Sequence, residues 1–181
     1  MTGARDCARS ESLWDNARLM VTTRSARAED APAVAALVTQ LGYESTADEV
    51  AQRLARVLAR SDQQFIVAED SGRLVGWVHV ELAEYVESGV FAVIGGLVVD
   101  RAHRRQGIGA ALMAGAEAWA RQHGCGVMRL WSSTTRTPAH RFYEGLGYAQ
   151  VKTQYSFVKP LDASGAAAAT RLVPRVEPET R

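Results

Sequence analysis

Residues 97–112 read Leu97-Val-Val-Asp-Arg-Ala-His-Arg-Arg-Gln-Gly-Ile-Gly-Ala-Ala-Leu112. An apolar strand pattern runs into a basic loop, and Gly107 and Gly109 then open an amphipathic helix. The first N–H groups of a helix lack partners, and together with the helix dipole they favour an anion. Neither glycine has a side chain to obstruct a phosphate, and Arg104 and Arg105 add positive charge at the rim. The stretch therefore predicts a phosphate-binding loop whose spacing suits a pyrophosphate.

Two other interpretations of this loop remain open. A dinucleotide-binding fingerprint would need a third glycine where Leu112 stands, and the glycines sit several residues past the strand, so that match is weak. A solvated arginine-rich turn before an ordinary helix start would need no ligand at all. A Walker-type phosphate loop is excluded, because the only lysines are Lys152 and Lys159 and no Gly-Lys-Ser/Thr tripeptide occurs.

Length and composition bound the class of protein. The chain has 181 residues, of which 47% are hydrophobic and 23% charged, and these values are typical of one globular domain. The formal net charge of +1 argues against a dedicated nucleic-acid-binding protein. No apolar run approaches the roughly 18 residues of a membrane span, and residues 1–20 show no signal-peptide pattern. Cys7 and Cys125 are too few for a disulfide framework and have no metal-ligand spacing. We therefore expect a cytoplasmic protein that holds no metal and binds neither nucleic acid nor membrane.

The remaining patterns predict one mixed α/β domain over residues 20–161. Strands are expected at 21–26, 65–69, 73–82, 90–99 and 127–132, with a final pair within 148–158. Helices are expected at about 31–41, 46–60, 107–123 and 138–146. This order is typical of a mixed sheet with helices on both faces. Residues 1–19 are expected to be an extension, either disordered or a short helix, and residues 162–181 a disordered tail.

Short local signals mark the ends of these elements. Asp30 is expected to cap the first helix, and Thr46 with Glu49 forms a capping box for the second. The tripeptide Asp70-Ser-Gly72 predicts a hairpin turn. Gly95-Gly96, within an otherwise apolar strand, indicates a bulge or a point of close approach.

Three segments, in this order, resemble the motifs of the GNAT superfamily of N-acetyltransferases. Arg104-Arg-Gln-Gly-Ile-Gly109 resembles the signature loop that holds the pyrophosphate of acetyl-CoA in that family. Gly96-Leu-Val-Val-Asp100 resembles the family's fourth strand, and Ala139-His-Arg-Phe-Tyr-Glu-Gly-Leu-Gly-Tyr148 resembles its later Ala/Tyr/Gly segment. The resemblance extends over residues 21–161. It implies a twisted sheet of six to seven strands, splayed between the fourth and the fifth, and an N-acetyltransferase that depends on acetyl-CoA.

The resemblance also implies where acetyl-CoA would bind. In the family, pantetheine fills the splay as a pseudo-strand, so main-chain groups of Leu97 and Val99 would pair with it, and the N–H of Leu97 or Val98 would face the thioester oxygen. A buried strand core would explain the same residues, and the two interpretations are compatible. Arg136 stands where the family usually has asparagine, so a cofactor contact and an exposed cation both remain open for it. The implied cofactor-binding residues are Leu97, Val98, Val99, Arg104, Arg105, Gln106, Gly107, Ile108, Gly109, Ala110, Arg136 and Tyr143.

Candidates for proton transfer follow from the same resemblance. Tyr143 would lie beside the thioester sulfur, where its phenol can protonate the departing thiolate, and an aromatic helix face packed on the sheet is the alternative. Many relatives carry a glutamate just before the bulge, but residues 90–99 contain no carboxylate. We therefore expect Glu81 or Glu84 to attract the amine or relay its proton, while a solvated hairpin end would explain both residues. His79 could titrate near neutral pH, although a lone strand histidine is more often structural.

By the same resemblance, the acceptor cleft is lined by Gly42-Tyr-Glu-Ser45 and Glu84-Tyr-Val-Glu87. Two tyrosines with several carboxylates favour a small, positively charged amine over a protein N-terminus. Residues 117–121 and 124–125 are also similar to some aminoglycoside 6'-N-acetyltransferases. The three ordered motifs imply direct attack of a primary amine on acetyl-CoA in a ternary complex, and dimerisation, which is common among relatives, is expected as well. The absent fourth-strand glutamate keeps a second hypothesis open, a non-catalytic acyl-CoA-binding sensor or regulatory module.

Overall fold

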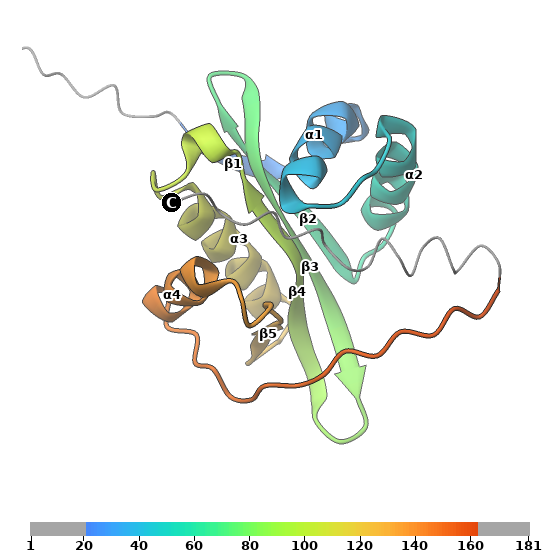
Figure 1. Cartoon of the computed structure of the whole chain (residues 1–181), viewed down its shortest axis with the longest axis vertical. Helices are drawn as coiled ribbons and strands as arrows, with labels where there is room; N and C mark the ends of the chain where they lie inside the picture. Colours follow the sequence, from blue (N-terminus) through green and yellow to red (C-terminus); the bar gives the residue numbers. More distant parts are fainter. Residues whose placement is uncertain (1–20, 163–181) are drawn as a thin grey trace, which may run out of the picture.

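The computed structural model of the protein describes residues 21–162 (Figure 1). Its strands are β1 (Val21–Ser25), β2 (Gln63–Asp70), β3 (Arg73–Tyr85), β4 (Gly89–Val99) and β5 (Met128–Leu130). Its helices are α1 (Ala31–Leu41), α2 (Ala47–Leu58), α3 (Ile108–Gln122) and α4 (Thr137–Gly145), with short 3-10 helices at Ala28–Asp30 (η1) and Arg101–His103 (η2). The extension expected over residues 1–19 and the expected tail, apart from Asp162, lie outside the described residues.

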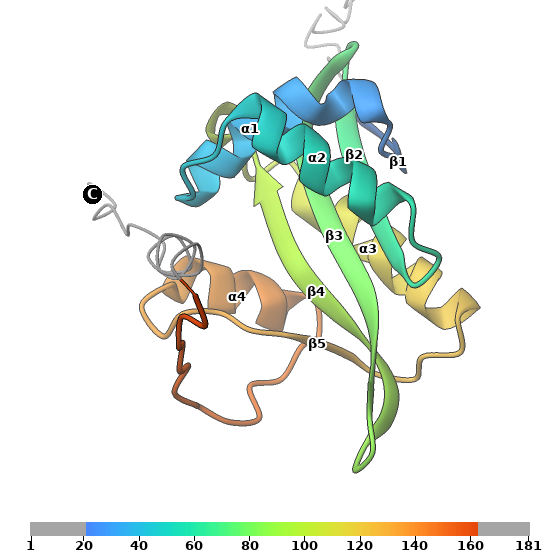
Figure 2. The same ribbon diagram turned by 90° about the vertical axis from the view of Figure 1, so that its right-hand side faces the viewer.

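The strands form one mixed sheet in the order β1-β2-β3-β4-β5. Neighbouring strands are antiparallel, except for β4 and β5, which run parallel. Figures 1 and 2 show α1 and α2 on one face of the sheet and α3 on the other, with α4 beside β5. The predicted α/β class, with helices on both faces of a mixed sheet, is therefore confirmed. None of the helices within residues 21–162 is long and apolar enough to span a membrane.

Two apolar layers hold the helices to the sheet. One layer packs α3 on β2, β3 and β4, and Val78, Val80, Leu112 and Met113 are excluded from water there. The other layer packs α1 and α2 on the opposite face, around Trp77. Because both faces are covered, the middles of β2, β3 and β4 are buried without interruption and have no alternating pattern.

Two of the predicted local signals are present as expected. The Thr46 hydroxyl accepts a hydrogen bond from the Glu49 N–H at 3.2 Å, and the Glu49 carboxylate accepts one from the Thr46 N–H at 2.9 Å, so a capping box begins α2. In the β2–β3 turn, Ser71 and Gly72 have φ angles of 51° and 81°. Two successive positive φ angles are the geometry of a tight hairpin turn.

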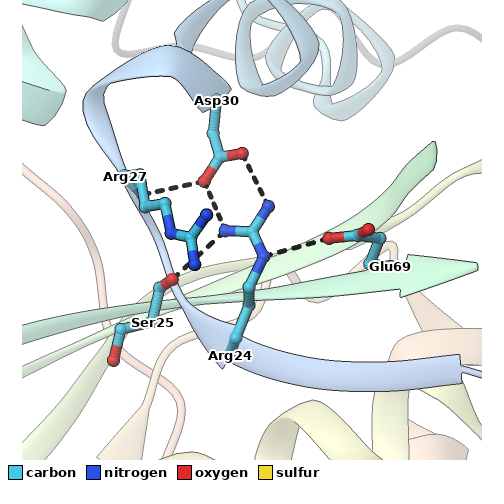
Figure 3. A network of polar contacts seen from close by, with 5 residues as sticks. All are labelled: Arg24, Ser25, Arg27, Asp30 and Glu69. Atoms are coloured by element: carbon cyan, nitrogen blue, oxygen red, sulfur yellow. Dashed lines mark hydrogen bonds and ion pairs between the residues drawn. The ribbon is translucent and has the colours of Figure 1, made fainter. Parts of the chain in front are cut away.

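Asp30 is the centre of a polar network that ties β1 to η1 and β2 (Figure 3). Arg24 donates from its two terminal nitrogens to the Asp30 carboxylate, at 2.8 and 2.9 Å, and from Nε to Glu69 at 3.0 Å. The Arg27 N–H donates to the same Asp30 carboxylate at 2.8 Å. Asp30 precedes α1, but its side chain makes no capping hydrogen bond there. The prediction that it caps α1 is wrong, because Arg24 and the Arg27 N–H occupy its oxygens.

Gly95 forms the bulge that the sequence predicted in β4. The β3–β4 register pairs His79 with Gly96 and then Val80 with Ile94, which leaves Gly95 as the extra residue. A Cβ atom on Gly95 would lie 2.8 Å from Nδ1 of His79, so a larger residue would not fit without a shift. Pairing of β4 with β5 ends at Ile94, immediately before the bulge.

The strand pair expected within residues 148–158 is not formed, so the described sheet has five strands where six or seven were expected. The segment 149–162 runs on beyond α4 without joining the sheet (Figures 1 and 2). Its apolar side chains are exposed, with Tyr155 at 90% and Phe157 at 91%. Alternating apolar residues favour a strand only when a neighbouring strand accepts the backbone hydrogen bonds, and within residues 21–162 none does.

Candidate active site

Past the bulge, β4 has a free edge, by which we mean the main-chain groups of residues 95–99 on the side away from β3. β4 stays paired with β3 as far as Val99, but within the described chain no strand pairs with its other side after Ile94. The Val98 side chain is buried in the α1–α2 layer, whereas Leu97 and Val99 pack against the α3 layer. Side-chain packing thus holds the strand in place while its edge remains available, so the strand-core and ligand-pairing interpretations are compatible.

Asp100 anchors the loop that follows β4. Its carboxylate accepts a hydrogen bond from the Ala102 N–H at 2.8 Å and lies 3.4 Å from Nη2 of Arg73 and 3.5 Å from Nδ1 of His103. The Ala102 hydrogen bond, followed by these basic groups, holds the pKa of Asp100 below its ordinary value. The sequence predictions did not single out Asp100, although an acid directly after a strand is a capping signal. It organises the start of the loop into η2.

The N–H groups at the start of α3 face no acceptor among the described residues. The first hydrogen bond of the helix runs from Ala111 N–H to the Gly107 carbonyl at 3.0 Å. Within residues 21–162, no main-chain or side-chain acceptor bonds the N–H groups of Ile108, Gly109 and Ala110, and Gly107 offers no side-chain cap. The Ile108 side chain is buried, so the helix start is fixed in the core while its amides remain unpaired. Three adjacent amides at a helix N-terminus favour an anion.

The loop before these amides is basic and has an unusual backbone. Arg105 and Gly107 have φ angles of 61° and 82°, and a positive φ is costly for a residue other than glycine. The side chains of Arg104, Arg105 and Gln106 are exposed. Arg104 Nε donates to the Val99 carbonyl at 3.3 Å, which brings this guanidinium to the end of β4. The predicted loop residues therefore lie beside the free edge of β4.

Helix α4 packs on the start of α3 and brings Tyr143 to the same region. A Cβ atom on Gly109 would lie 3.1 Å from the Phe142 ring, so glycine is needed here for helix packing as well. Tyr143 is partly buried against the α3 layer, with its ring 5.2 Å from that of Phe142 and 6.0 Å from that of Tyr148. Burial raises the pKa of Tyr143 above its ordinary value. Its phenol therefore keeps its proton at neutral pH and can act as a donor.

Two hydroxyl groups near α4 were missed by the sequence predictions. Tyr148 donates from its hydroxyl to Glu117 at 3.0 Å, and burial together with this carboxylate raises the pKa of Tyr148. Ser132, just after β5, has a buried hydroxyl that makes no hydrogen bond within the described residues. An unpartnered buried hydroxyl is costly and therefore indicates a site for a polar ligand atom or water. Arg136 is exposed, which agrees with its interpretation as an exposed cation.

The structure separates the two glutamates that were expected to assist the amine. Glu81 lies on the same strand face as Trp77 and accepts a hydrogen bond from Gln63 Nε2 at 3.1 Å. Glu84 is exposed near the β3–β4 turn. Because it follows Glu81 by three residues and side chains alternate along a strand, it points to the opposite face of β3. Their catalytic roles stay predictions, and of the two only Glu81 is on the α1–α2 side of the bulge.

His79 lies at the bulge and has a polar partner. Its Nε2 is 3.3 Å from Gln63 Oε1, and its ring stacks on that of Phe65 at 5.8 Å. Burial lowers the pKa of His79 below its ordinary value, and the negative charge of Glu81 opposes this effect only in part. The ring is therefore a neutral imidazole at neutral pH.

An open hollow of about 440 Å³ lies where α1 leads into α2. Its lining residues are Thr39, Glu44, Ser45, Thr46 and Glu49. This hollow includes part of the loop Gly42–Ser45 that was expected to border the acceptor cleft. Glu44 and Glu49 give the hollow negative charge, part of which Arg53 balances by its ion pair with Glu49 at 3.8 Å. Within residues 21–162, His, Cys, Asp and Glu side chains form no group of three or more that could hold a metal ion.

The sequence model of the acetyltransferase (GNAT) family matches residues 30–148, a range that includes the bulge, the amides of α3 and Tyr143. The chain belongs to the GNAT family. GNAT acetyltransferases are acyltransferases, and this chain is an enzyme of that class. The resemblance predicted from the sequence motifs is thereby confirmed.

Named relatives of this GNAT chain act on amines. Aminoglycoside N(6')-acetyltransferase type 1 of Stenotrophomonas maltophilia is 30% identical over 148 residues, which cover 79% of this chain and 95% of the relative. Aminoalkylphosphonate N-acetyltransferase of Salmonella typhimurium is 31% identical over 144 residues, which cover 76% of this chain and 90% of the relative. A solved aminoglycoside N-acetyltransferase, AAC(6')-Iy in complex with CoA, has a TM-score of 0.72 at 19% identity and covers 78% and 95% of the two chains. The last comparison shows that the fold is shared.

Proposed function

We propose that the protein transfers an acetyl group from acetyl-CoA to a primary amine of a small cationic molecule, by direct attack in a ternary complex. One observation carries the proposal: the unpaired amides of α3 lie between the free edge of β4 and the helix that bears Tyr143. Membership of the GNAT family supports acetyl transfer, and the solved relative in complex with CoA supports the choice of acyl carrier.

The residues at this place fit acetyl-CoA. The three amides at the start of α3 would bind its pyrophosphate, and the exposed Arg104 and Arg105 would add positive charge beside it. Main-chain groups of residues 97–99 would pair with pantetheine along the free edge. The buried hydroxyl of Ser132 would gain a polar partner when the site is filled. When bound, acetyl-CoA supplies the thioester carbonyl carbon that the amine attacks.

Tyr143 is proposed as the proton donor to the sulfur that leaves. Burial raises the pKa of Tyr143, so the phenol holds its proton until negative charge develops on the departing sulfur beside it. Phe142 seats the helix against Gly109 and thereby fixes the position of Tyr143 relative to the amide loop. This arrangement orients the donor before the reaction begins.

The acceptor is proposed to be a polycationic amine of the aminoglycoside kind. Glu44 and Glu49 line the hollow between α1 and α2, and Glu81 lies on the face of β3 that these helices cover. Several carboxylates on this face of the sheet would attract the ammonium groups of a polycationic acceptor and repel a phosphonate. The charge pattern therefore favours the acceptor class named for the Stenotrophomonas relative over that named for the Salmonella relative.

Two measurements on the purified full chain test the proposal. Titration calorimetry with acetyl-CoA should show saturable binding, and a thiol-release assay should show turnover with aminoglycosides above that with aminoalkylphosphonates or peptides. No binding at millimolar acetyl-CoA would remove the foundation of the proposal. Tight binding without thiol release for any amine would favour the acyl-CoA sensor instead. In that case Tyr143→Phe would change nothing measurable, whereas in an enzyme it lowers turnover at unchanged acetyl-CoA affinity.

A homodimer and a cytoplasmic location are proposed as further properties of the protein. The exposed side chains of Val151, Tyr155, Phe157 and Leu161 form an apolar segment that a second copy of the chain would cover. Sedimentation velocity should then show a dimer that the double replacement Tyr155→Ser and Phe157→Ser dissociates. A monomer at every micromolar concentration would contradict the dimer, and cell fractionation tests the location.

A further inference from the structure

We infer that His79 is the catalytic base of the reaction, with Nδ1 accepting the proton of the attacking amine at the β4 bulge; this rests on the proposed function. Nδ1 lies 2.8 Å from the position that a Cβ atom on Gly95 would take. Gly95 is exposed, and it is the first residue of β4 beyond the last pair with β5. The ring nitrogen therefore faces the beginning of the free edge through the space that this glycine leaves.

The hydrogen bonds of Gln63 decide which ring nitrogen carries the proton. The Gln63 amide nitrogen donates to the Glu81 carboxylate at 3.1 Å, and a carboxylate only accepts. The Gln63 oxygen is therefore the atom that meets His79 Nε2, at 3.3 Å, and it also only accepts. Nε2 must carry the hydrogen of the neutral ring, so Nδ1 has the lone pair. The chain of hydrogen bonds from Glu81 through Gln63 to His79 thus holds the imidazole in the tautomer with its hydrogen on Nε2, which the reaction needs.

The surroundings of the ring keep this lone pair available. Gln63 and Phe65 on β2 and Gly95 on β4 are uncharged, and among the described residues Glu81, on the same strand, is the charged group that acts on His79. Burial lowers the pKa of the imidazole, so it is neutral when the amine arrives. Once the ring is protonated, the Glu81 charge stabilises it through Gln63. Gln63 and Glu81 are positioning residues in this scheme.

The step balances without a further reactant. The lone pair of the neutral amine forms the C–N bond to the acetyl carbon, and the C–S electron pair leaves with sulfur. One N–H proton passes to Nδ1 of His79, and the Tyr143 hydroxyl proton passes to sulfur. Proton exchange with water then restores both side chains. β4 contains no carboxylate, and His79 supplies the base from β3.

The test uses the full chain, with His79→Gln as the main variant and His123→Gln as the control. His123 is exposed at the end of α3 and bonds only within its own helix in the described chain. His79→Gln should lower kcat roughly 100-fold, within the range of a lost general base, while acetyl-CoA binding by calorimetry changes less than twofold. The acidic limb of the kcat–pH profile should disappear. The control variant should keep both kcat and the profile.

A second variant and a spectroscopic measurement keep the test independent of folding. Gln63→Leu should lower kcat about tenfold and shift the acidic limb of the kcat–pH profile. The reason is that, without the Gln63 oxygen, nothing among the described residues holds the hydrogen of the neutral ring on Nε2. Nitrogen-15 spectra of labelled histidine should show His79 protonated at Nε2 and unprotonated at Nδ1 at neutral pH. Full kcat with an unchanged pH profile in His79→Gln, or a proton on Nδ1, would overturn the inference alone. Absence of turnover by the unmodified chain with every amine would overturn the proposed function and the inference with it.

Discussion

Replacement of Gly107 by alanine would test the amide site at the start of α3, and the chain contains a matched control. Gly107 has a φ of +82° and Gly72, in the β2–β3 turn, a φ of +81°. A Cβ atom at either position would meet nothing within 4 Å. The two variants Gly107→Ala and Gly72→Ala therefore suffer the same backbone strain and no clash, and they differ only in what lies beside them.

The size of each effect follows from this geometry. An alanine in the left-handed region costs about 1 kcal/mol relative to glycine, so both variants should melt about 3 °C below the unmodified chain. At Gly107, the added methyl group also enters the space that a pyrophosphate needs in front of the α3 amides. Loss of one charge-assisted hydrogen bond costs about 1.5–3 kcal/mol, which weakens acetyl-CoA binding roughly 10- to 100-fold.

Thermal melting and titration calorimetry on the two variants separate strain from binding. Equal losses of melting temperature with a large loss of acetyl-CoA affinity in Gly107→Ala alone would support the amide site. The reasoning is refuted if both variants bind acetyl-CoA as tightly as the unmodified chain does, because the amides of Ile108, Gly109 and Ala110 would then not be where the pyrophosphate binds. Unequal melting temperatures would refute the premise that the two backbones are equivalent.

Three further variants probe the other parts of the molecule. Tyr143→Phe should lower kcat roughly 100-fold or more at unchanged acetyl-CoA affinity in calorimetry, with Tyr155→Phe as a control that keeps full kcat. Glu44→Gln should raise KM for a polycationic amine about threefold, because it removes one charge from the hollow, and steady-state kinetics should show no change in kcat. Asp30→Asn should lose about 1–2 kcal/mol in urea unfolding at pH 7, since it weakens the bonds to Arg24. The pKa of Asp30 lies below its ordinary value, so its contribution is present at neutral pH and fades in acid, and the two unfolding curves should converge below about pH 4.

Local signals predicted most of the fold because they act over a few residues. The capping box at Thr46 and Glu49 and the turn at Ser71-Gly72 depend on hydrogen bonds and φ angles within four residues. The α3 loop was predicted for the same reason, since unpaired amides are a property of any helix start. The bulge at Gly95 was found because two glycines interrupt an apolar strand. Each of these features needs no knowledge of distant residues.

The wrong predictions concern groups whose partners the local sequence pattern does not specify. Asp30 is a residue type that often caps helices, but its carboxylate binds Arg24 across the β1–η1 turn. Arg24 is in turn held by Glu69, which is 45 residues after it in the sequence. The alternation within residues 148–158 is a strand pattern, but whether a strand forms depends on a neighbour that the pattern cannot specify. The pairing of Glu81 with Gln63 and of Gln63 with His79 likewise joins two strands. Tautomer and orientation therefore could not be predicted from the residues themselves.

The bulge links the shape of the site to the choice of base. β4 has no carboxylate at the bulge, where Ile94 precedes Gly95 and Gly96 follows it. A Cβ atom at Gly95 would lie 2.8 Å from His79 Nδ1, so a carboxylate at that position would require the imidazole to shift from where it lies. Gly95 carries no catalytic side chain, but its lack of a Cβ atom leaves the space that the His79 ring occupies. The bulge at Gly95 lies where β4–β5 pairing ends. In the proposed reaction, it also gives the amine access to Nδ1 of His79.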